Sequence, residues 1–284
     1  MTTDLLVSTQ WLADHAADPH VKILDASFKM PGVSPLARQD FLAAHIPGAQ
    51  FFDIDEVADH SNALPHMFPS AEQFGRQVGA FGVGNEDVIV LYDSGTWVAA
   101  PRAWWMFLSF GHRQVRVLDG GLKKWRAEGR PVESGIPDTP KPATFVARFE
   151  PERVRARPQL VNNLNSRSEQ VVDARARERF EGTAVEAWPG RRSGHIPGSY
   201  NVPYGTLINS DGTLKSVSEL SAAFSNAGVD RNKPVVTSCG SGVSAAVLAL
   251  ALHRLGMEDV ALYDGSWAEW GLPDGPEIAT GPSR

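Results

Sequence analysis

The two halves of the 284-residue chain repeat each other, and this repetition constrains the fold more than any other feature of the sequence. The segment HIPGA at 45–49 returns as HIPGS at 195–199. Three more short matches keep the same order in both halves: LDA with VDA, FGV with AGV, and LDGG with YDGS, the last pair each followed by a tryptophan. The period is far longer than that of a solenoid of short repeats. We therefore predict a duplicated domain.

Each half alternates short apolar runs with amphipathic stretches of helical spacing. The expected strands are 21–26, 49–52, 88–92 and 115–118 in the first half, and 171–174, 199–202, 235–238 and 260–263 in the second. The expected helices are 74–81, 101–110, 218–227 and 243–255. Ser70 with Gln73, and Ser216 with Glu219, predict capping boxes. Apolar strands that alternate with helices are typical of a parallel sheet with helices on both faces, so both halves are assigned to the α/β class.

A proline-rich stretch separates the two halves. Five prolines fall between positions 137 and 158, and proline interrupts helices and central strands. We expect a first domain at 1–135, a linker at 136–158 and a second domain at 159–284. The polar, proline-spaced composition of the linker favours a semi-stiff strap over the surface.

Composition excludes several classes of protein. The chain carries 27 Lys and Arg against 33 Asp and Glu, a formal net charge of −6, which argues against a nucleic-acid-binding face. The longest apolar run, near 243–252, is too short to cross a membrane. The N-terminus lacks the cationic region of a signal peptide. We expect a cytoplasmic protein that binds neither membranes nor nucleic acids.

The single cysteine, Cys239, excludes an internal disulfide framework and a cysteine-rich metal cage, and we expect no metal or organic cofactor. It directly follows an expected strand, and Gly240, Ser241 and Gly242 lie between it and an expected helix. Ligands bind outside the carboxyl ends of the strands in such sheets. The glycines permit a tight turn with inward-pointing N–H groups, beside the positive end of the helix. This context activates a thiol, so we predict a reactive nucleophile rather than a buried structural thiol.

The residues around the cysteine disfavour several known chemistries. A tyrosine-phosphatase loop needs an arginine six residues after the cysteine, where Ala245 stands. A papain-like site has its cysteine near the N-terminus and a distant histidine downstream, whereas only His253 follows Cys239. A thioredoxin motif needs a second cysteine. The remaining interpretation is a thiolate that accepts one sulfur atom and becomes a persulfide.

The two HIPG segments, the glycine-rich cysteine loop and the segment YDGSWAEW at 263–270 resemble the two-domain rhodanese (sulfurtransferase) superfamily over essentially the whole chain. The loop sequence CGSGVSA resembles the 3-mercaptopyruvate branch, whereas the thiosulfate branch typically carries cationic residues directly after the cysteine. The resemblance implies two tandem rhodanese-like domains with a nucleophile only in the second. Asp93 stands opposite Cys239 in the repeat and cannot carry sulfane sulfur, so we expect the first domain to be catalytically silent.

The resemblance also implies a substrate site. Arg179 matches the family's arginine for the substrate carboxylate, a group well matched by a planar bidentate cation. The family's second arginine corresponds to Trp188 here, and Arg191 or Arg192 in the same loop are the candidates to replace it. Four residues of the cysteine loop are expected to contribute to the site: Gly240, Gly242, Val243 and Ser244, the last in place of the family's usual threonine.

A proton relay is implied by the resemblance to the 3-mercaptopyruvate branch. Ser241 matches its serine, His66 its histidine and Asp55 its carboxylate. An imidazole oriented by a carboxylate can move a proton near neutral pH. Asp55 and His66 lie in the first half and Ser241 in the second, so the relay requires a site at the domain interface.

These residues predict a sulfurtransferase that takes a sulfane sulfur from 3-mercaptopyruvate on Cys239. The sulfur is expected to pass to cyanide or to a thiol, such as that of a thioredoxin-like protein. One alternative is a thiosulfate sulfurtransferase that uses the same cysteine. Another, of a different class, is a non-enzymatic carrier that receives its persulfide from a partner protein. A second domain and a proton relay favour the enzyme, because a carrier needs neither.

Overall fold

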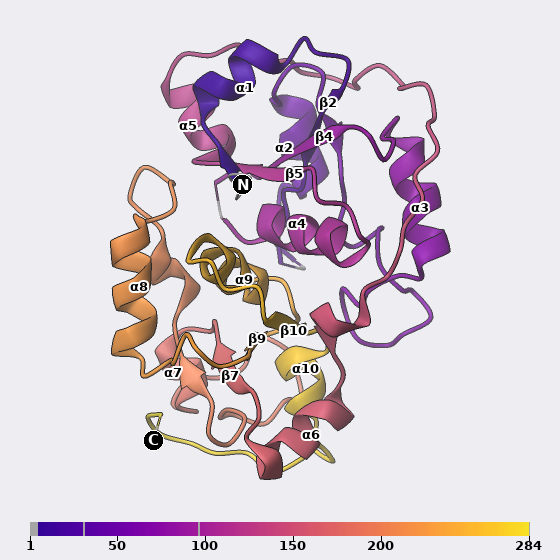
Figure 1. Cartoon of the computed structure of the whole chain (residues 1–284). Coiled ribbons are helices and arrows are strands. Elements are labelled where there is room, and N and C mark those ends of the chain that lie inside the picture. Colours follow the sequence, from indigo (N-terminus) through magenta and orange to yellow (C-terminus); the bar gives the residue numbers. More distant parts are fainter. Residues whose placement is uncertain (1–4, 31, 96, 284) are drawn as a thin grey trace. The chain divides into compact units, whose positions relative to one another are not determined.

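The fold is that of a computed structural model, which describes residues 5–30, 32–95 and 97–283. The chain forms two compact units, each built on one copy of the repeat (Figure 1). The first unit extends to Phe149 and the second begins at Glu150, apart from two short segments. His60–Met67 belongs to the second unit, and Asn209–Leu214 belongs to the first.

The first unit contains a five-stranded parallel sheet with the strand order β1-β5-β4-β2-β3. Its strands are β1 Leu6–Val7, β2 Val21–Asp25, β3 Gln50–Phe51, β4 Val88–Tyr92 and β5 Val115–Leu118. Its helices are α1 Thr9–His15, α2 Ala37–Ala43, α3 Ala71–Ala80, α4 Ala99–Ser109 and α5 Gly121–Ala127.

The second unit repeats this topology strand for strand, with the order β6-β10-β9-β7-β8. Its strands are β6 Val154–Arg155, β7 Gln170–Asp173, β8 Tyr200–Asn201, β9 Val235–Ser238 and β10 Val260–Tyr263. Its helices are α6 Arg157–Ser166, α7 Arg177–Phe180, α8 Val217–Asn226, α9 Ala245–Arg254 and α10 Ser266–Trp270, with short 3₁₀ turns η1 Pro151–Arg153 and η2 Tyr204–Leu207. The duplication expected from the sequence is confirmed.

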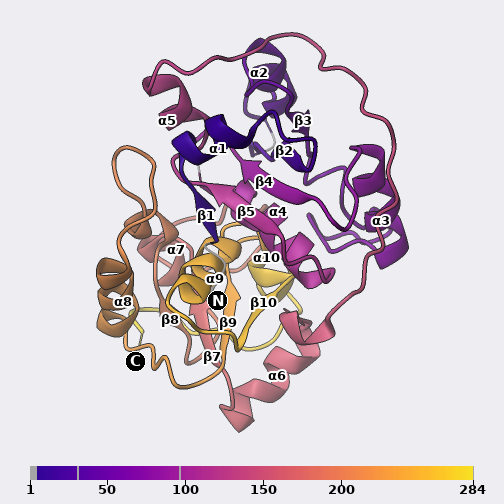
Figure 2. The same ribbon diagram turned by 45° about the horizontal axis from the view of Figure 1, so that its top comes forward.

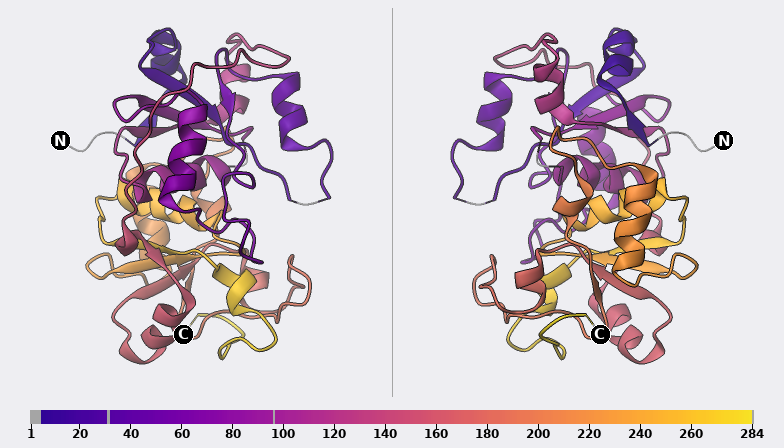
Figure 3. Two further views of the ribbon diagram at one scale, coloured as in Figure 1. Left: turned by 90° about the vertical axis from the view of Figure 1, so that its right-hand side faces the viewer. Right: turned by 90° about the vertical axis from the view of Figure 1, so that its left-hand side faces the viewer.

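Helices cover each sheet (Figures 2 and 3). In the first unit, α1, α2 and α5 share one core cluster with the strands, through Leu12, Phe41 and Trp125, whereas α4 contacts β4 and β5 outside that cluster. In the second unit, α6 and α10 join a cluster through Leu160 and Trp267, and α9 contacts β9 and β10 outside it. The predicted α/β class is confirmed in both units. No helix in the described part of the chain is long and apolar enough to cross a membrane.

The expected strands agree with the observed ones to within one residue at each end, and the expected helices to within three. The two-residue edge strands β1 and β6, the short helices α1, α2, α5, α7 and α10, and the ten-residue helix α6 were not predicted. The short segments complete too few periods for a hydrophobic pattern to mark them. Helix α6 is as long as α3, but its sequence RPQLVNNLNS contains too few apolar residues to show a helical pattern.

Only one of the two expected capping boxes is complete. Ser216 and Glu219 cap α8 reciprocally. Ser70 Oγ accepts the N–H of Gln73 at 3.2 Å, but the Gln73 side chain donates to Ala58 O at 2.8 Å and does not return to the cap. A nearby backbone carbonyl competes successfully for this amide, which corrects the prediction at Ser70.

Residues 136–150 contain no helix or strand and pack along the first unit. Ala143 N donates to Gly79 O at 2.9 Å, and Phe145 is buried. A Cβ at Gly79 would lie 2.5 Å from Ala143 O, so glycine in α3 is what lets this strap lie close. Regular structure resumes at η1, before the expected end of the linker. Pro158 itself lies in the first turn of α6, where its missing N–H is not needed.

The repeated histidines support the two HIPG turns. His45 Nδ1 lies 2.8 Å from Phe41 O, and His195 Nδ1 lies 2.8 Å from Phe180 O. Each imidazole also stacks on the ring of that phenylalanine. Burial lowers the pKa of His195, which favours the neutral ring. Both histidines therefore serve the architecture.

Candidate active site

Cys239 lies at the carboxyl end of β9, an inner strand of the second sheet, and is 2% exposed. Residues 239–244, the cysteine loop, lead from this strand into α9. Gly242 has φ +77°, a backbone conformation that glycine adopts without strain. Val243 is buried and Ser244 is the N-cap residue of α9. The strand–turn–helix context predicted for the cysteine is therefore present.

Two backbone N–H groups of α10 hold the carbonyls of the cysteine loop. Trp267 N donates to Cys239 O at 2.9 Å, and Ala268 N donates to Gly240 O at 2.7 Å. A trans peptide places a carbonyl and the following N–H on opposite sides. The N–H groups of Gly240 and Ser241 therefore point away from α10, free to face an anion.

The corresponding loop of the first unit holds a carboxylate with its backbone N–H groups. There the carboxylate of Asp93 accepts N–H groups from the backbone around it, on both of its oxygens. The four donors are Gly95, Trp97, Val98 and Ala100, at 2.9 to 3.4 Å. Leu122 N donates to Asp93 O at 2.9 Å, as Trp267 N does to Cys239 O. In the repeat, an anion therefore occupies the loop at the position that corresponds to Cys239.

Arg179 extends from α7 to the cysteine loop. A Cβ at Gly240 would lie 3.4 Å from Arg179 Nη2, so this guanidinium lies beside the residue that follows the nucleophile. The side chain is 25% exposed. Its Nε and Nη2 donate to Glu186 Oε2 at 3.2 and 2.6 Å, which fixes its direction. The geometry brings together the two residues on which the sequence prediction depended most.

A buried ion network behind Arg179 was missed by sequence reasoning. Arg175 is 2% exposed, and it donates to both oxygens of Asp173 and to Glu186 Oε1. Its guanidinium carbon lies 4.2 Å from the ring centre of Trp267. Burial opposes the charge of Arg175, but the two carboxylates and Cys239 raise its pKa overall. The repeat held a signal for this network: Asp173 and Arg175 correspond to Asp25 and Ser27, so the cation is peculiar to the cysteine-bearing half.

Trp188 stands beside the same glycine. A Cβ at Gly240 would lie 3.4 Å from Trp188 Nε1, and the indole meets the ring of His66 edge-on, with ring centres 6.1 Å apart. The residue that borders Gly240 together with Arg179 is thus an indole in place of a second cation.

The two arginines considered as replacements bind backbone carbonyls. Arg191 Nε donates to Ala268 O at 2.9 Å. Arg192 Nη2 donates to Trp270 O at 3.1 Å and to Pro276 O at 2.8 Å. Carbonyls in the last turn of a helix lack partners within the helix, and these guanidinium groups supply them. Arg191 and Arg192 therefore hold α10 and the segment after it, and a role for either of them in binding the donor stays a prediction.

The three relay residues are divided between the units. Ser241 lies in the cysteine loop and is 7% exposed. His66 is 6% exposed and belongs to the second unit, although the sequence placed it in the first half. Asp55 is exposed in the first unit, where its N–H donates to the carboxylate of Asp53. The fold thus groups His66 with Ser241 and Cys239.

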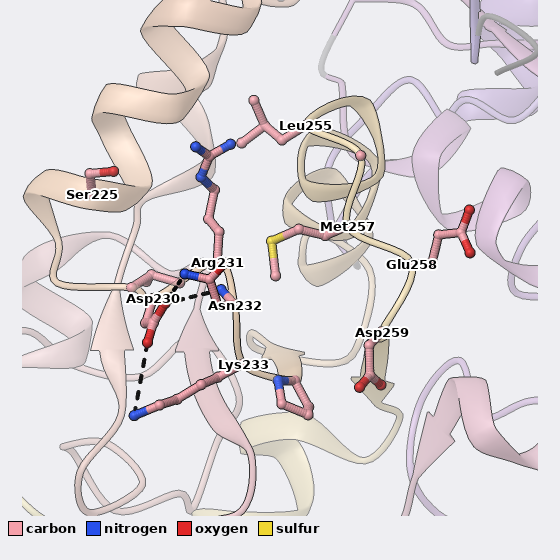
Figure 4. Close-up of a pocket in the computed structure, with 12 residues that line it drawn as sticks. Ser225, Asp230, Arg231, Asn232, Lys233, Leu255, Met257, Glu258 and Asp259 are labelled. Carbon is pink, nitrogen blue, oxygen red and sulfur yellow. Dashed lines mark hydrogen bonds and ion pairs between the residues drawn. The ribbon is translucent and has the colours of Figure 1, made fainter.

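One cavity lies elsewhere on the second unit (Figure 4). It measures about 800 Å³ and lies where β9 and β10 begin, lined by residues that include Lys233 and Asp259. Its polar groups partly pair with one another, as Asn232 and Lys233 do with Asp230. Ligands of parallel sheets bind at the carboxyl ends of the strands, so this cavity is at the wrong end for chemistry at Cys239.

The fold and the cysteine loop place the chain among known proteins. A family model described as the rhodanese-like domain matches residues 8–128 and again 157–272. The chain therefore belongs to the rhodanese-like family, with two copies of the domain.

Three relatives illustrate the similarity. The 3-mercaptopyruvate sulfurtransferase of Escherichia coli is 42% identical over 95% of this chain and 96% of its own. The thiosulfate sulfurtransferase of Rattus norvegicus is 44% identical over 93% of this chain and 91% of its own. The crystal structure of SseA from Escherichia coli, described as a 3-mercaptopyruvate sulfotransferase, superposes with a TM-score of 0.85 at 41% identity, covering 93% of this chain and 99% of SseA.

Proposed function

We propose that this chain is a sulfurtransferase that moves a sulfane sulfur from 3-mercaptopyruvate to a thiol or to cyanide through a persulfide on Cys239. One observation carries the proposal: the guanidinium of Arg179 lies beside Gly240, next to the nucleophile, in a loop whose Cys239 and Gly240 carbonyls are held by N–H groups of α10. The names of the relatives support the same chemistry.

The reaction has two steps. The Cys239 thiolate attacks the sulfur of 3-mercaptopyruvate; the carbon–sulfur bond breaks, and its electron pair remains on the carbon as the enolate of pyruvate. That carbon takes up a proton, and Cys239 keeps the sulfur as a persulfide. An acceptor thiolate or cyanide then attacks the outer sulfur, the sulfur–sulfur bond breaks and the Cys239 thiolate returns. The N–H groups of the loop stabilise the anionic sulfur in both steps.

Arg179 binds the carboxylate and keto oxygen of the donor. A planar guanidinium matches these oxygens, and Glu186 holds it in place from behind. The cysteine loop itself contains no cation, since Gly240, Ser241 and Gly242 are neutral. The donor carboxylate therefore depends on one arginine as its cationic partner, and the donor also meets the indole of Trp188, which borders the same glycine.

We assign proton transfer to Ser241, His66 and Asp55. His66 supports this role because it meets Trp188, which itself borders the cysteine loop. The acceptor is a thiol, and we propose a thioredoxin-like protein in the cytoplasm, because a small reducing dithiol can attack the outer sulfur and release it.

Thiosulfate is the second candidate donor. The rat relative named thiosulfate sulfurtransferase, and a relative from Arabidopsis thaliana named for both donors, favour it. Steady-state kinetics would decide between the two donors, with cyanide as the common acceptor and Cys239→Ser as the blank. We expect kcat/KM to be higher for 3-mercaptopyruvate; a higher value for thiosulfate would reverse the assignment of the donor. Full turnover by Cys239→Ser would refute both.

Intact mass separates the enzyme from the carrier. A gain of about 32 Da on Cys239 with 3-mercaptopyruvate alone is expected of the enzyme. A protein that gains this mass only from a partner protein would be a carrier.

A further inference from the structure

Ser266 has a left-handed backbone conformation directly beside the nucleophile. Its φ is +47°, and it is fully buried at the start of α10. The corresponding residue of the first unit is Gly121, with φ +54°. Matching hydrogen bonds establish the correspondence, since the next residue in each unit donates its N–H to Asp93 O or to Cys239 O at 2.9 Å.

A side chain at this position is costly. Left-handed backbone conformations bring Cβ too close to neighbouring backbone atoms, and only glycine adopts them freely. The first unit has glycine, as this rule predicts. The second unit has a serine at almost the same φ, so an interaction of its side chain must compensate for the strain.

The hydroxyl of Ser266 provides that interaction. It accepts the backbone N–H of Cys239 at 3.1 Å and donates to Tyr263 O at 2.8 Å. The hydroxyl thus joins the end of β10 to the backbone of the nucleophile. Both partners are buried, so neither has water available as an alternative.

The silent unit has no room for such a side chain. A Cβ at Gly121 would lie 2.5 Å from Asp93 O, closer than real atoms approach. The loop after β9 is therefore shaped to admit a serine that the loop after β4 excludes. The serine therefore occurs in the half that has Cys239, and the glycine occurs in the half that has Asp93.

We propose that Ser266 is a positioning residue for Cys239. Its hydroxyl holds the backbone N–H of the nucleophile, which fixes the direction of the sulfur relative to the N–H groups of Gly240 and Ser241. The role rests on the proposed function, because it serves the reaction at that sulfur. Ser266 touches no substrate, so its loss slows the reaction at Cys239 without weakening the binding of the donor.

The test uses the full chain with two substitutions at the site and one control. Ser266→Gly removes the hydroxyl and relieves the backbone, and Ser266→Ala removes the hydroxyl but retains the strain. Ser216→Ala removes another serine hydroxyl of the same unit that also accepts a backbone N–H, that of Glu219 at the start of α8. The measurements are kcat and KM with 3-mercaptopyruvate and cyanide, the melting temperature, and hydrogen exchange in the peptide that contains Cys239.

We expect both Ser266 variants to lose about tenfold in kcat with KM within about twofold of the unmodified chain. Their Cys239 peptide should exchange faster. Ser266→Gly should melt at a higher temperature than Ser266→Ala, since only glycine is free of strain. Ser216→Ala should lower the melting temperature and leave kcat unchanged.

Unchanged kcat and exchange in Ser266→Gly would overturn the proposal, because the strained serine would then have no effect on the nucleophile. If the unmodified chain transfers no sulfur from either donor, the proposed function fails. Hydrogen exchange then still decides whether Ser266 holds Cys239, since it needs no donor.

Discussion

Glu186 Oε2 accepts two hydrogen bonds from the guanidinium of Arg179, at 2.6 and 3.2 Å. The same carboxylate accepts a hydrogen bond from the buried Arg175 on its other oxygen. One carboxylate thus links the interior of the second unit to the cation that lies beside the cysteine loop.

Glu186→Gln should weaken both the fold and the donor site. A buried ion pair that loses one partner leaves an uncompensated charge, so we expect the free energy of unfolding to fall by about 3 kcal/mol. Without its carboxylate partner Arg179 is less well oriented, and KM for 3-mercaptopyruvate should rise about tenfold. Glu178→Gln, at an exposed position of α7, the helix that carries Arg179, is the control and should change neither quantity. An unchanged KM in Glu186→Gln would show that Arg179 needs no such support.

Arg179→Lys should show whether binding of the donor depends on the positive charge of Arg179 or on the planar shape of its guanidinium. Lysine keeps the positive charge but lacks the planar fork that matches two oxygens. We expect KM for 3-mercaptopyruvate to rise about tenfold and kcat to change less. Arg177→Lys, a largely exposed arginine of α7, is the matched control. Equal kinetics of Arg179→Lys and the unmodified chain would remove Arg179 from the donor site.

Trp188→Arg should supply the second cation that the loop lacks. The indole borders Gly240, so a guanidinium there can reach the carboxylate of the donor. We expect kcat/KM for 3-mercaptopyruvate to rise about tenfold, mainly through KM. Trp188→Phe retains an aromatic wall without a cation and should not show this gain. A fall in kcat/KM in both variants would mean that the indole N–H itself contacts the donor.

The stability of the first unit should depend on pH through Asp25. Burial raises the pKa of this carboxyl to about 6, from a usual value near 3.8. As the pH rises, this carboxyl ionises in the unfolded chain before it ionises in the folded one. Its contribution to the free energy of unfolding is therefore fully present below pH 3.8 and is lost as the pH rises through about 6. Asp25→Asn abolishes this titration. Between pH 3.8 and about 6, the free energy of unfolding of the unmodified chain should fall by about 2–3 kcal/mol relative to that of Asp25→Asn.

Chemical denaturation of both proteins from pH 4 to pH 8 measures this difference. Asp173→Asn is the contrasting control, because its carboxylate is paired with Arg175 and its loss should destabilise the fold near neutral pH. A constant difference between Asp25→Asn and the unmodified chain would show that Asp25 is ionised throughout.

The repeat, the inner strands and the cysteine loop could be predicted from local sequence. Four-residue apolar runs such as Val260–Tyr263 are typical of a buried strand, and the glycines after Cys239 mark the turn. Such signals depend only on neighbours along the chain, and they identified the nucleophile and the fold class.

The partners of long side chains could not be predicted in this way. Arg191 and Arg192 lie in the expected loop, yet their guanidinium groups bind carbonyls some 80 residues away in sequence, from 268 to 276. Glu186 joins Arg175 and Arg179 because α7 and the following loop fold over one another. A flexible side chain binds whichever polar group the packing brings near, and no periodicity records that choice.

The sequence by itself determined the duplicated α/β architecture, the site of the nucleophile and the absence of a second cation at Trp188, because these follow from residue identity and spacing. Only the tertiary structure decided that His66 belongs with the cysteine-bearing unit and that Ser266 holds the backbone of Cys239. Both depend on contacts between segments distant in sequence, which form only when the chain buries its apolar surface and must satisfy the polar groups buried with it.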